Sequence, residues 1–235
     1  TLAARAVREK ALKIGAVLLE ANPEDLELGE GTISAKGSPR RRVSLARVAM
    51  VASGSFPGST MPKGIEPGLQ ETRYFTPPQA TYTNGAHVVV VEGDPELAQV
   101  RILRYVVAHD CGAMINPMVV EGQILGGVAH GIGDSLYEEL VYDDTGQLLT
   151  GSYMDYLLPT ASEVPRIEVA HLETPSPFVP GGMKGAGEGG TIPVAAAIAA
   201  AIDDAFSNYG VRITELPINP EKLWRLIKGN RTGLH

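Results

Sequence analysis

Hydrophobic residues recur at helical spacing in three long segments of the chain. Between Ala3 and Leu18 they predict a first helix, which ends before Pro23 because proline cannot continue a helix. A second helix is expected after Glu188, with Asp203 and Asp204 near its end facing solvent. Its predicted buried stripe consists of Val194, Ile198, Ile202 and Phe206. A final helix over residues 220–228 would pack Leu223, Trp224 and Ile227.

Runs of β-branched residues predict strands over residues 82–92, 101–108 and 167–172. Residues 26–35 and 140–150 read as hairpins, because each has a turn sequence at its centre. Ser44 is suited to cap a short helix through Val51, and the basic run at residues 40–42 is typical of a solvated loop. Strands and helices are interspersed without a regular βαβ repeat, so the predicted fold class is α+β with mixed sheets and packed helices.

A stretch rich in glycine and proline, residues 53–78, carries little hydrophobic periodicity. It is long for a simple loop, so we expect it to extend across a surface or to pack on a partner. The 235 residues therefore form either one domain over 1–235 or two subdomains with 53–78 as an extended connecting segment.

A glycine-rich helix is predicted to begin at Pro117, with Asn116 as its N-cap, and to run to about Glu139. Each helical glycine costs roughly 1 kcal/mol against alanine, so five of them need a physical reason. They are Gly122, Gly126, Gly127, Gly131 and Gly133. A shared polar face is formed by Gln123, Gly127, His130 and Asp134. This face contacts either a flat ligand or the backbone of another segment.

The run of residues 181–193 places one carboxylate, Glu188, among glycines and ahead of an alanine-rich helix. Glycine lets a backbone approach a ligand closely, and the start of a helix offers free N–H groups. Glu188 is thus a candidate reacting group held against something bulky. The alternative is a tight loop with a solvated glutamate.

Composition narrows the possible functions. The net charge is −7 without a long basic block, which argues against a nucleic-acid surface. Cys111 is the single cysteine, which excludes a disulfide framework and fits the cytoplasm. No apolar run reaches the roughly 18 residues of a membrane span. The sequence lacks a metal-ligand pattern and a P-loop, so Glu188 suits a general base acting on water or hydroxide bound to a cofactor that protein side chains do not ligate.

Several motifs, in chain order, resemble those of the molybdenum hydroxylases: xanthine dehydrogenases, aldehyde oxidases and oxidoreductases, and aerobic carbon monoxide dehydrogenases. Residues 184–188, Lys-Gly-Ala-Gly-Glu, are similar to the KGxGE segment of that family. Asp110-Cys111-Gly112, Asn116-Pro117 and Gly122-Gln123 are similar to its D-x-G, NP and GQ motifs. Residues 154–159 and 173–177 match further segments. The resemblance identifies the chain as the second molybdopterin-binding region of a large subunit.

In that family the pterin dithiolene holds the molybdenum, which implies molybdopterin as the cofactor, in its cytosine dinucleotide form, and no protein metal ligand. The resemblance implies that Glu188 is the base toward Mo–OH during oxidation of an aldehyde, an N-heterocycle or a similar small substrate with water-derived oxygen. It also implies that Gln123 hydrogen-bonds the pterin, with Gly127 beside it. The metal end would be lined by Lys184, Gly185, Ala186 and Gly187.

The resemblance further implies FAD and 2Fe-2S clusters on other domains or subunits, contact with the remainder of the large subunit, and a dimeric assembled enzyme. The family's other pterin motif and its substrate loop lie upstream of the matched region, so we expect the isolated chain to hold half of the cofactor cradle and to be inactive alone. The alternative is a non-catalytic split subunit, an assembly or binding module that supplies this half of the cradle.

Overall fold

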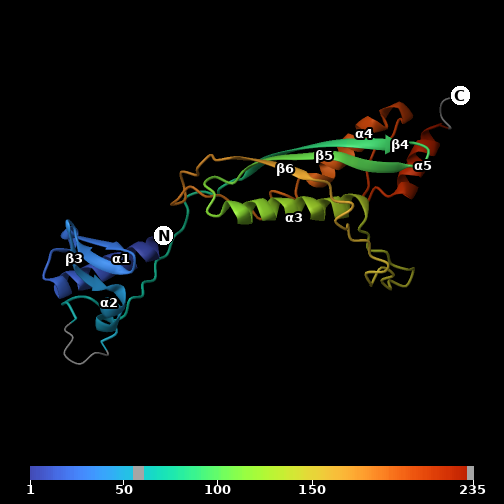
Figure 1. Ribbon diagram of the computed structural model, residues 1–235. Coiled ribbons are helices and arrows are strands. Elements are labelled where there is room, and N and C mark those ends of the chain that lie inside the picture. The colour runs from blue at the N-terminus through green and yellow to red at the C-terminus, as the bar shows by residue number, and fades with distance from the viewer. Residues whose placement is uncertain (55–60, 232–235) are drawn as a thin grey trace. The chain divides into compact units, whose positions relative to one another are not determined.

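The computed structural model describes residues 1–54 and 61–231 (Figure 1). The chain divides into two compact units, Thr1–Thr76 and Pro77–His235. The division falls inside the segment 53–78, whose residues 55–60 lie outside the described residues. Residues 61–78 form neither helix nor strand.

The first unit is a three-stranded antiparallel sheet with two helices. In chain order it contains α1 (Leu2–Leu19), the short helix η1 (Pro23–Asp25), β1 (Leu26–Gly29), β2 (Thr32–Ala35), β3 (Ser38–Ser44) and α2 (Leu45–Ala52). The strand order is β1-β2-β3. Ile14 of α1, Ile33 of β2 and Val48 of α2 are fully buried in one core.

The sequence predicted most of this unit. The first helix, the hairpin of β1 and β2, and the helix after Ser44 are confirmed, and the Ser44 Oγ accepts a hydrogen bond from the Arg47 N–H at 3.2 Å. The prediction of a loop at residues 40–42 was wrong, because they belong to β3, in which Arg42 pairs with Ser34 of β2. Nearly every β3 side chain is exposed, so the strand lacks the alternating pattern that would reveal it. The Arg41 guanidinium binds the carbonyls of Leu19 and Glu20 at the end of α1.

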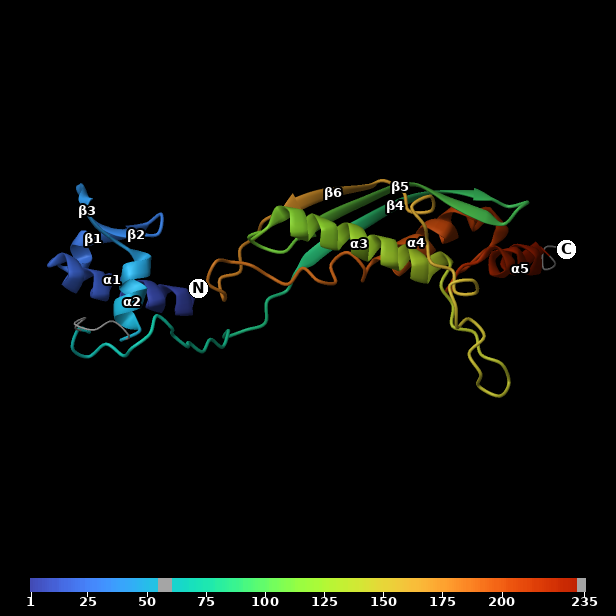
Figure 2. The same cartoon turned by 60° about the horizontal axis from the view of Figure 1, so that its bottom comes forward.

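The second unit contains a mixed sheet of β4 (Asn84–Asp94), β5 (Gln99–Asp110) and β6 (Ile167–Leu172). β4 pairs with β5 in antiparallel register and β6 pairs with β5 in parallel register. Its helices are α3 (Pro117–Leu136), α4 (Val194–Ala205), η2 (Ser207–Tyr209) and α5 (Pro220–Arg231). α3 runs along the sheet in both ribbon views (Figures 1 and 2). The core joins Tyr105 and Val107 of β5 to Ile124 and Val128 of α3 and to Ile198 of α4. The predicted α+β class with mixed sheets is confirmed.

Three predicted strands, the N-cap of α3 at Asn116 and the buried stripe of α4 are also confirmed. The hairpin predicted at residues 140–150 forms, but its flanks are too short to be strands. Its turn closes because the Gly146 N–H binds the Asp143 carbonyl at 3.0 Å. The flanks are joined by the isolated bridge between Tyr142 and Leu148, with the Leu149 N–H donating to the Val141 carbonyl at 2.8 Å and the Asp143 N–H to the Gln147 carbonyl at 3.0 Å. An isolated two-stranded ribbon is marginal in water without a surface to pack on.

Two predictions about single side chains were wrong. Asp203 is not solvated: it accepts a hydrogen bond from the Ile213 N–H at 2.7 Å and pairs with Arg212 at 3.2 Å. It thereby fastens the segment after α4, a contact that helical periodicity cannot reveal. Trp224 is 48% exposed, whereas Leu223 and Ile227, four positions apart on one face of α5, are buried.

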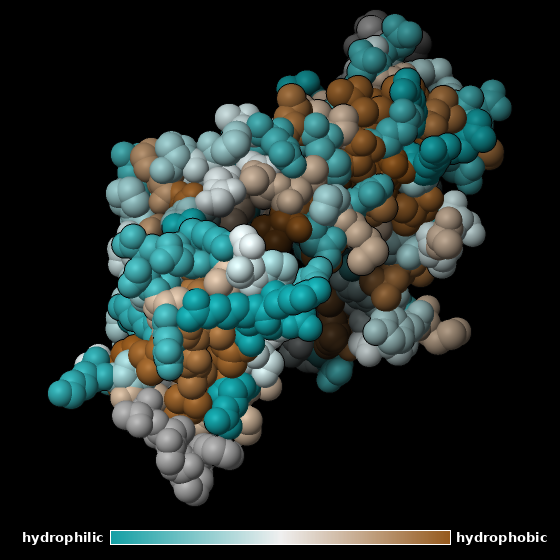
Figure 3. Space-filling model, turned by 60° about the vertical axis from the view of Figure 1, so that its left-hand side comes forward, coloured by the Kyte–Doolittle hydropathy of each residue, from teal (hydrophilic) through white to brown (hydrophobic). Residues whose placement is uncertain are grey.

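Large apolar side chains are exposed on the second unit, and the space-filling view shows brown, hydrophobic surface (Figure 3). The most exposed include Ile115, Met118, Tyr153 and Met154. Across the described ranges, no helix combines the length and the apolar character that a bilayer crossing requires.

Candidate functional site

The glycine-rich loop that carries Glu188 connects β6 to α4. Gly181 and Gly182 have φ angles of 94° and 74°, which side-chain-bearing residues rarely adopt. The Glu188 carbonyl then accepts hydrogen bonds from the Thr191 N–H at 3.0 Å and the Ile192 N–H at 3.2 Å, which closes a tight turn before α4 begins at Val194. Glu188 therefore lies one turn ahead of α4 rather than at its first residue.

The start of the loop is fastened to the turn that follows β5. The Lys184 N–H donates to the Cys111 carbonyl at 2.7 Å, and Met183 forms a bridge with Gly112. A Cβ at Gly112 would lie 2.2 Å from the Gly182 carbonyl oxygen, so only glycine fits there. The D-C-G and K-G-A-G-E segments, separated by about 70 residues, thus form one structure.

Asp110 is the electrostatic centre of this junction. Asp110 is buried, and its carboxylate accepts hydrogen bonds from the N–H groups of Gly112 at 2.8 Å and Thr174 at 3.1 Å. The Thr174 side chain and these two N–H groups hold the pKa of the Asp110 carboxyl well below its usual value. The Lys184 ammonium lies 3.5 Å from Asp110 and is almost fully buried. The Lys184 ammonium therefore forms an internal ion pair that anchors the loop.

The Glu188 end of the loop is exposed and open. A Cβ at Gly185 or Gly187 would meet no atom within 4 Å, and Glu188 itself is exposed. In the described part of the chain the Glu188 carboxylate has neither a hydrogen-bond partner nor an ion-pair partner. Gln123 reaches this point from α3, and its Nε2 donates to the Gly187 carbonyl at 2.8 Å. The structure thus places Gln123 of α3 against the peptide that directly precedes Glu188.

Close packing explains three of the five helical glycines. A Cβ at Gly127 would lie 2.9 Å from the backbone carbonyl carbon of Gly190, and a Cβ at Gly131 would lie 2.5 Å from the side-chain Cβ of Val194. A Cβ at Gly133 would overlap the Glu138 carboxylate. Conversely, a Cβ at Gly190 would lie 2.5 Å from the Ile124 carbonyl oxygen. The backbone of Gly190 in the loop occupies the space beside Gly127. The contact of Gly127 with a cofactor remains a prediction.

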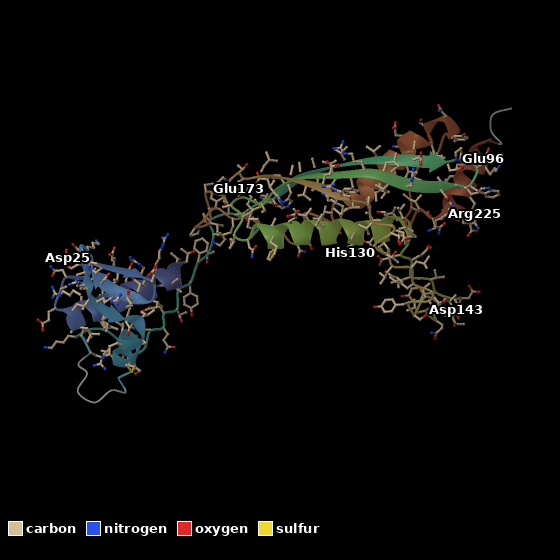
Figure 4. The ribbon with its side chains drawn as sticks, viewed as in Figure 1. Asp25, Glu96, His130, Asp143, Glu173 and Arg225 are labelled. Carbon is tan, nitrogen blue, oxygen red and sulfur yellow. The ribbon has the colours of Figure 1, made fainter. Side chains whose placement is uncertain are left out.

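The remaining polar residues of the predicted face point elsewhere. His130 and Asp134 of α3 form an i,i+4 pair at 3.2 Å with both side chains more than half exposed, and His130 is labelled in Figure 4. Glu173, which is not part of this face and directly follows β6, accepts from the Met114 N–H at 3.4 Å (Figure 4). Gln123 is thus the side chain of this face that binds the glycine loop.

A group of histidines packs against the loop, and the sequence analysis did not predict it. The His87 Nε2 lies 3.3 Å from the Gly189 carbonyl, and a Cβ at Gly189 would lie 2.3 Å from the His109 Nε2. His109 pairs in register with His171 of β6, and their rings meet edge to face at 6.4 Å. The available signal was strand phase: His109 continues the inward positions of Tyr105 and Val107. Strand neighbours, however, are not written in the sequence.

Burial governs the charge of these histidines. It is the largest cause that lowers the pKa of both His87 and His109, and the neighbouring imidazoles lower each pKa further. Both rings are therefore neutral at neutral pH. The Nδ1 atoms of His109 and His171 are buried without a hydrogen-bond partner. The described residues contain no group of three or more His, Cys, Asp or Glu side chains that could hold a metal ion.

Comparison with known proteins places this geometry in context. The profile of the family described as "Molybdopterin cofactor-binding domain" matches residues 1–165. The nicotine 6-hydroxylase large subunit of Paenarthrobacter nicotinovorans is 43% identical over 227 residues, which is 97% of this chain and 28% of that protein. The carbon monoxide dehydrogenase large chain of Hydrogenophaga pseudoflava is 37% identical over 99% of this chain and 28% of its own length.

Among solved structures, quinoline 2-oxidoreductase from Pseudomonas putida 86 is similar with a TM-score of 0.82 and 43% identity, covering 96% of this chain and 28% of that chain. The chain thus spans somewhat more than a quarter of the length of the relatives it matches.

Proposed function

We propose, since the chain belongs to the molybdopterin cofactor-binding family of molybdenum hydroxylase large subunits, that it supplies part of the cofactor site and the general base of such an enzyme. The substrate class we propose is an N-heterocycle, an aldehyde or a similar small molecule. The names of two relatives at 43% identity, nicotine 6-hydroxylase and quinoline 2-oxidoreductase, support the first of these.

The residues of the loop fit a bulky, flat cofactor. The backbone of Gly185 and Gly187 is open on the side where a Cβ would project, and Ala186 between them has only a methyl group. The Gln123 side chain donates through Nε2 to the loop, which leaves its Oε1 to accept from a ligand. We propose that the Gln123 carboxamide binds the pterin and that the N–H groups of residues 185–187 line the metal end of the cofactor, while Lys184 maintains the loop through Asp110.

When bound, the molybdenum cofactor supplies a water-derived oxygen to the substrate and accepts two electrons from it. The contribution of this chain is proton transfer and positioning. The exposed Glu188 carboxylate has both oxygens available, so either can accept a proton from an acidic group presented at the loop. The single observation that carries the proposal is this unpartnered carboxylate, held in place by Gln123 on the carbonyl that precedes it.

The decisive variant is Glu188→Gln in the complete enzyme. Glutamine keeps the shape of the side chain but cannot take a proton, so kcat should fall by about 10²–10⁴-fold while the molybdenum content stays normal. Glu215→Gln, which changes an exposed glutamate in the loop before α5, is the matched control and should keep the wild-type kcat. A Glu188→Gln enzyme with full cofactor and wild-type kcat would remove Glu188 from the mechanism.

We also propose that the cofactor is the cytosine dinucleotide form, that FAD and 2Fe-2S clusters reside on other domains or subunits, and that the assembled enzyme is a dimer in the cytoplasm. The printed names of relatives as a "large subunit" and as "subunit gamma" of a complex support a multi-subunit enzyme. The exposed apolar residues of the second unit, such as Tyr153 and Met154, support burial against the remainder of the large subunit.

A further inference from the structure

The carbonyl of Gly189, the residue after Glu188, is held by a side chain of the sheet. His87 of β4 places its Nε2 3.3 Å from the Gly189 carbonyl oxygen. A carbonyl oxygen only accepts hydrogen bonds, so the proton of this contact belongs to the His87 Nε2. Gly189 also lies against the His109 ring, where a side chain on Gly189 would overlap the imidazole. The backbone after Glu188 therefore rests directly on two imidazole rings.

Tyr105 of β5 stabilises this tautomer, because its hydroxyl binds the other His87 nitrogen. Its hydroxyl lies 2.9 Å from the His87 Nδ1, and Tyr105 is fully buried. Burial lowers the pKa of His87 and raises that of Tyr105, so the imidazole is neutral and the phenol protonated at neutral pH. With Nε2 protonated, Nδ1 must accept, and the Tyr105 O–H donates to it. The hydrogen bonds thus run in one direction, from Tyr105 through His87 to Gly189.

The peptide that precedes Glu188 is held by a side chain of α3. The Gln123 Nε2 donates a hydrogen bond to the Gly187 carbonyl at 2.8 Å. The carbonyls of the two residues on either side of Glu188, Gly187 and Gly189, thus each receive a hydrogen bond from a different element of the fold. The Gly187 carbonyl lies in the peptide bonded to the Glu188 nitrogen, and the Gly189 carbonyl lies one peptide further along the chain. Together the two contacts restrict the backbone segment from which the Glu188 side chain projects.

We propose that His87, with its tautomer fixed by Tyr105, is a positioning residue for Glu188. It acts through the Gly189 carbonyl and touches neither substrate nor cofactor. The inference rests on the proposed role of Glu188 as the base, and it adds a pair of residues on the sheet that keep this base aligned. Reacting groups must be held closely, because a misplacement of about 1 Å can lower a rate by about 10²-fold.

Three variants of the complete enzyme test this inference. His87→Phe keeps a planar ring and removes the N–H donor, whereas His87→Gln keeps a donor at nearly the same reach. Tyr105→Phe keeps the buried ring and removes the hydroxyl that fixes the tautomer, so it remains informative if His87→Phe folds poorly. His130→Gln, at the exposed histidine of α3, is the matched control.

Hydrogen exchange provides a readout that is independent of activity. The amides of Thr191 and Ile192 bind the Glu188 carbonyl, so their exchange reports on the turn around Glu188. We expect His87→Phe to speed exchange in residues 187–192 by about tenfold, the loss expected for one hydrogen bond. Tyr105→Phe should give a smaller increase, and His87→Gln and His130→Gln should remain close to wild type.

Kinetics provide the second readout. His87→Phe should lower kcat by about 10- to 100-fold with KM within about twofold and normal molybdenum content, because base alignment is lost while binding is kept. His87→Gln should recover most of kcat. Wild-type exchange in His87→Phe would overturn the inference.

Faster exchange with an unchanged kcat in His87→Phe would also overturn the inference, provided that Glu188→Gln has a low kcat. Glu188 would then remain the proposed base, and His87 would have no part in positioning it. If Glu188→Gln itself keeps the wild-type kcat, the proposed function fails, and the positioning role fails with it.

Discussion

A single methyl group at Gly190 should displace the Glu188 loop without changing any group that takes part in the chemistry. Gly190 is buried, and a Cβ there would lie 2.5 Å from the Ile124 carbonyl oxygen and 2.8 Å from the Ile124 Cα. These atoms belong to the backbone of α3, which cannot rotate out of the way as a side chain can. The φ of Gly190 lies outside the positive range, so alanine meets no backbone strain and the contact alone decides the effect.

The size of the displacement follows from the contact. The distance to the Ile124 oxygen must grow from 2.5 Å to the 3.4 Å of ordinary van der Waals contact, so the loop must move by about 0.9 Å. A reacting group misplaced by about 1 Å loses about 10²-fold in rate. Gly190 lies two residues after Glu188, and we therefore expect Gly190→Ala to lower kcat by about 10- to 100-fold. Overpacking should also destabilise the fold by about 1–3 kcal/mol.

The assay is steady-state kinetics of the complete enzyme, with kcat normalised to molybdenum content so that loss of cofactor is counted separately. Gly126→Ala is the matched control, because a Cβ at this exposed position of α3 meets no atom within 4 Å. That variant should keep kcat and gain up to about 1 kcal/mol from helix propensity. A Gly190→Ala enzyme with wild-type kcat per molybdenum would refute the reasoning that packing against α3 sets the position of Glu188.

Three further outcomes are expected. Asp110→Asn leaves the Lys184 ammonium without its charged partner, which should loosen this junction and speed hydrogen exchange in residues 110–113 and 182–185. Lys184→Met in the same chain should restore part of the protection, and wild-type exchange in Asp110→Asn would contradict the ion pair. Burial lowers the pKa of His87 and His109 below 6.5 in the folded state, so the unfolded chain binds more protons than the folded chain once the pH falls below about 6.5. The free energy of unfolding should therefore decrease over this range. Thermal scans between about pH 7.5 and pH 5 should show a falling melting temperature, and His109→Gln should make the fall smaller. The purified 235-residue chain should carry no stoichiometric molybdenum and show no turnover, and turnover of an aldehyde or N-heterocycle by the chain alone would contradict the need for the rest of the subunit.

The elements that the sequence predicted correctly are those whose local signals agree with their packing. α3 starts at Pro117 behind an Asn116 cap, and α4 buries the apolar stripe that its spacing predicts. The strand β3 gave no such signal, because nearly all its side chains are exposed and its stability comes from pairing with β2. Likewise, nothing local indicates that β6 pairs with β5 in parallel register across more than 50 intervening residues.

For the site, the sequence by itself determined the candidate groups: a carboxylate at Glu188 in a glycine loop and an amide at Gln123 on a glycine-rich helix. It left open whether a helical glycine faces a ligand or another backbone, since both require the same missing Cβ. Only the tertiary structure decided that Gly127 packs on Gly190, because that contact joins segments about 60 residues apart. For the same reason only the fold could place His87 beneath Gly189: a hydrogen bond across 102 residues depends on where strands and loops meet in space, and no local pattern encodes that meeting.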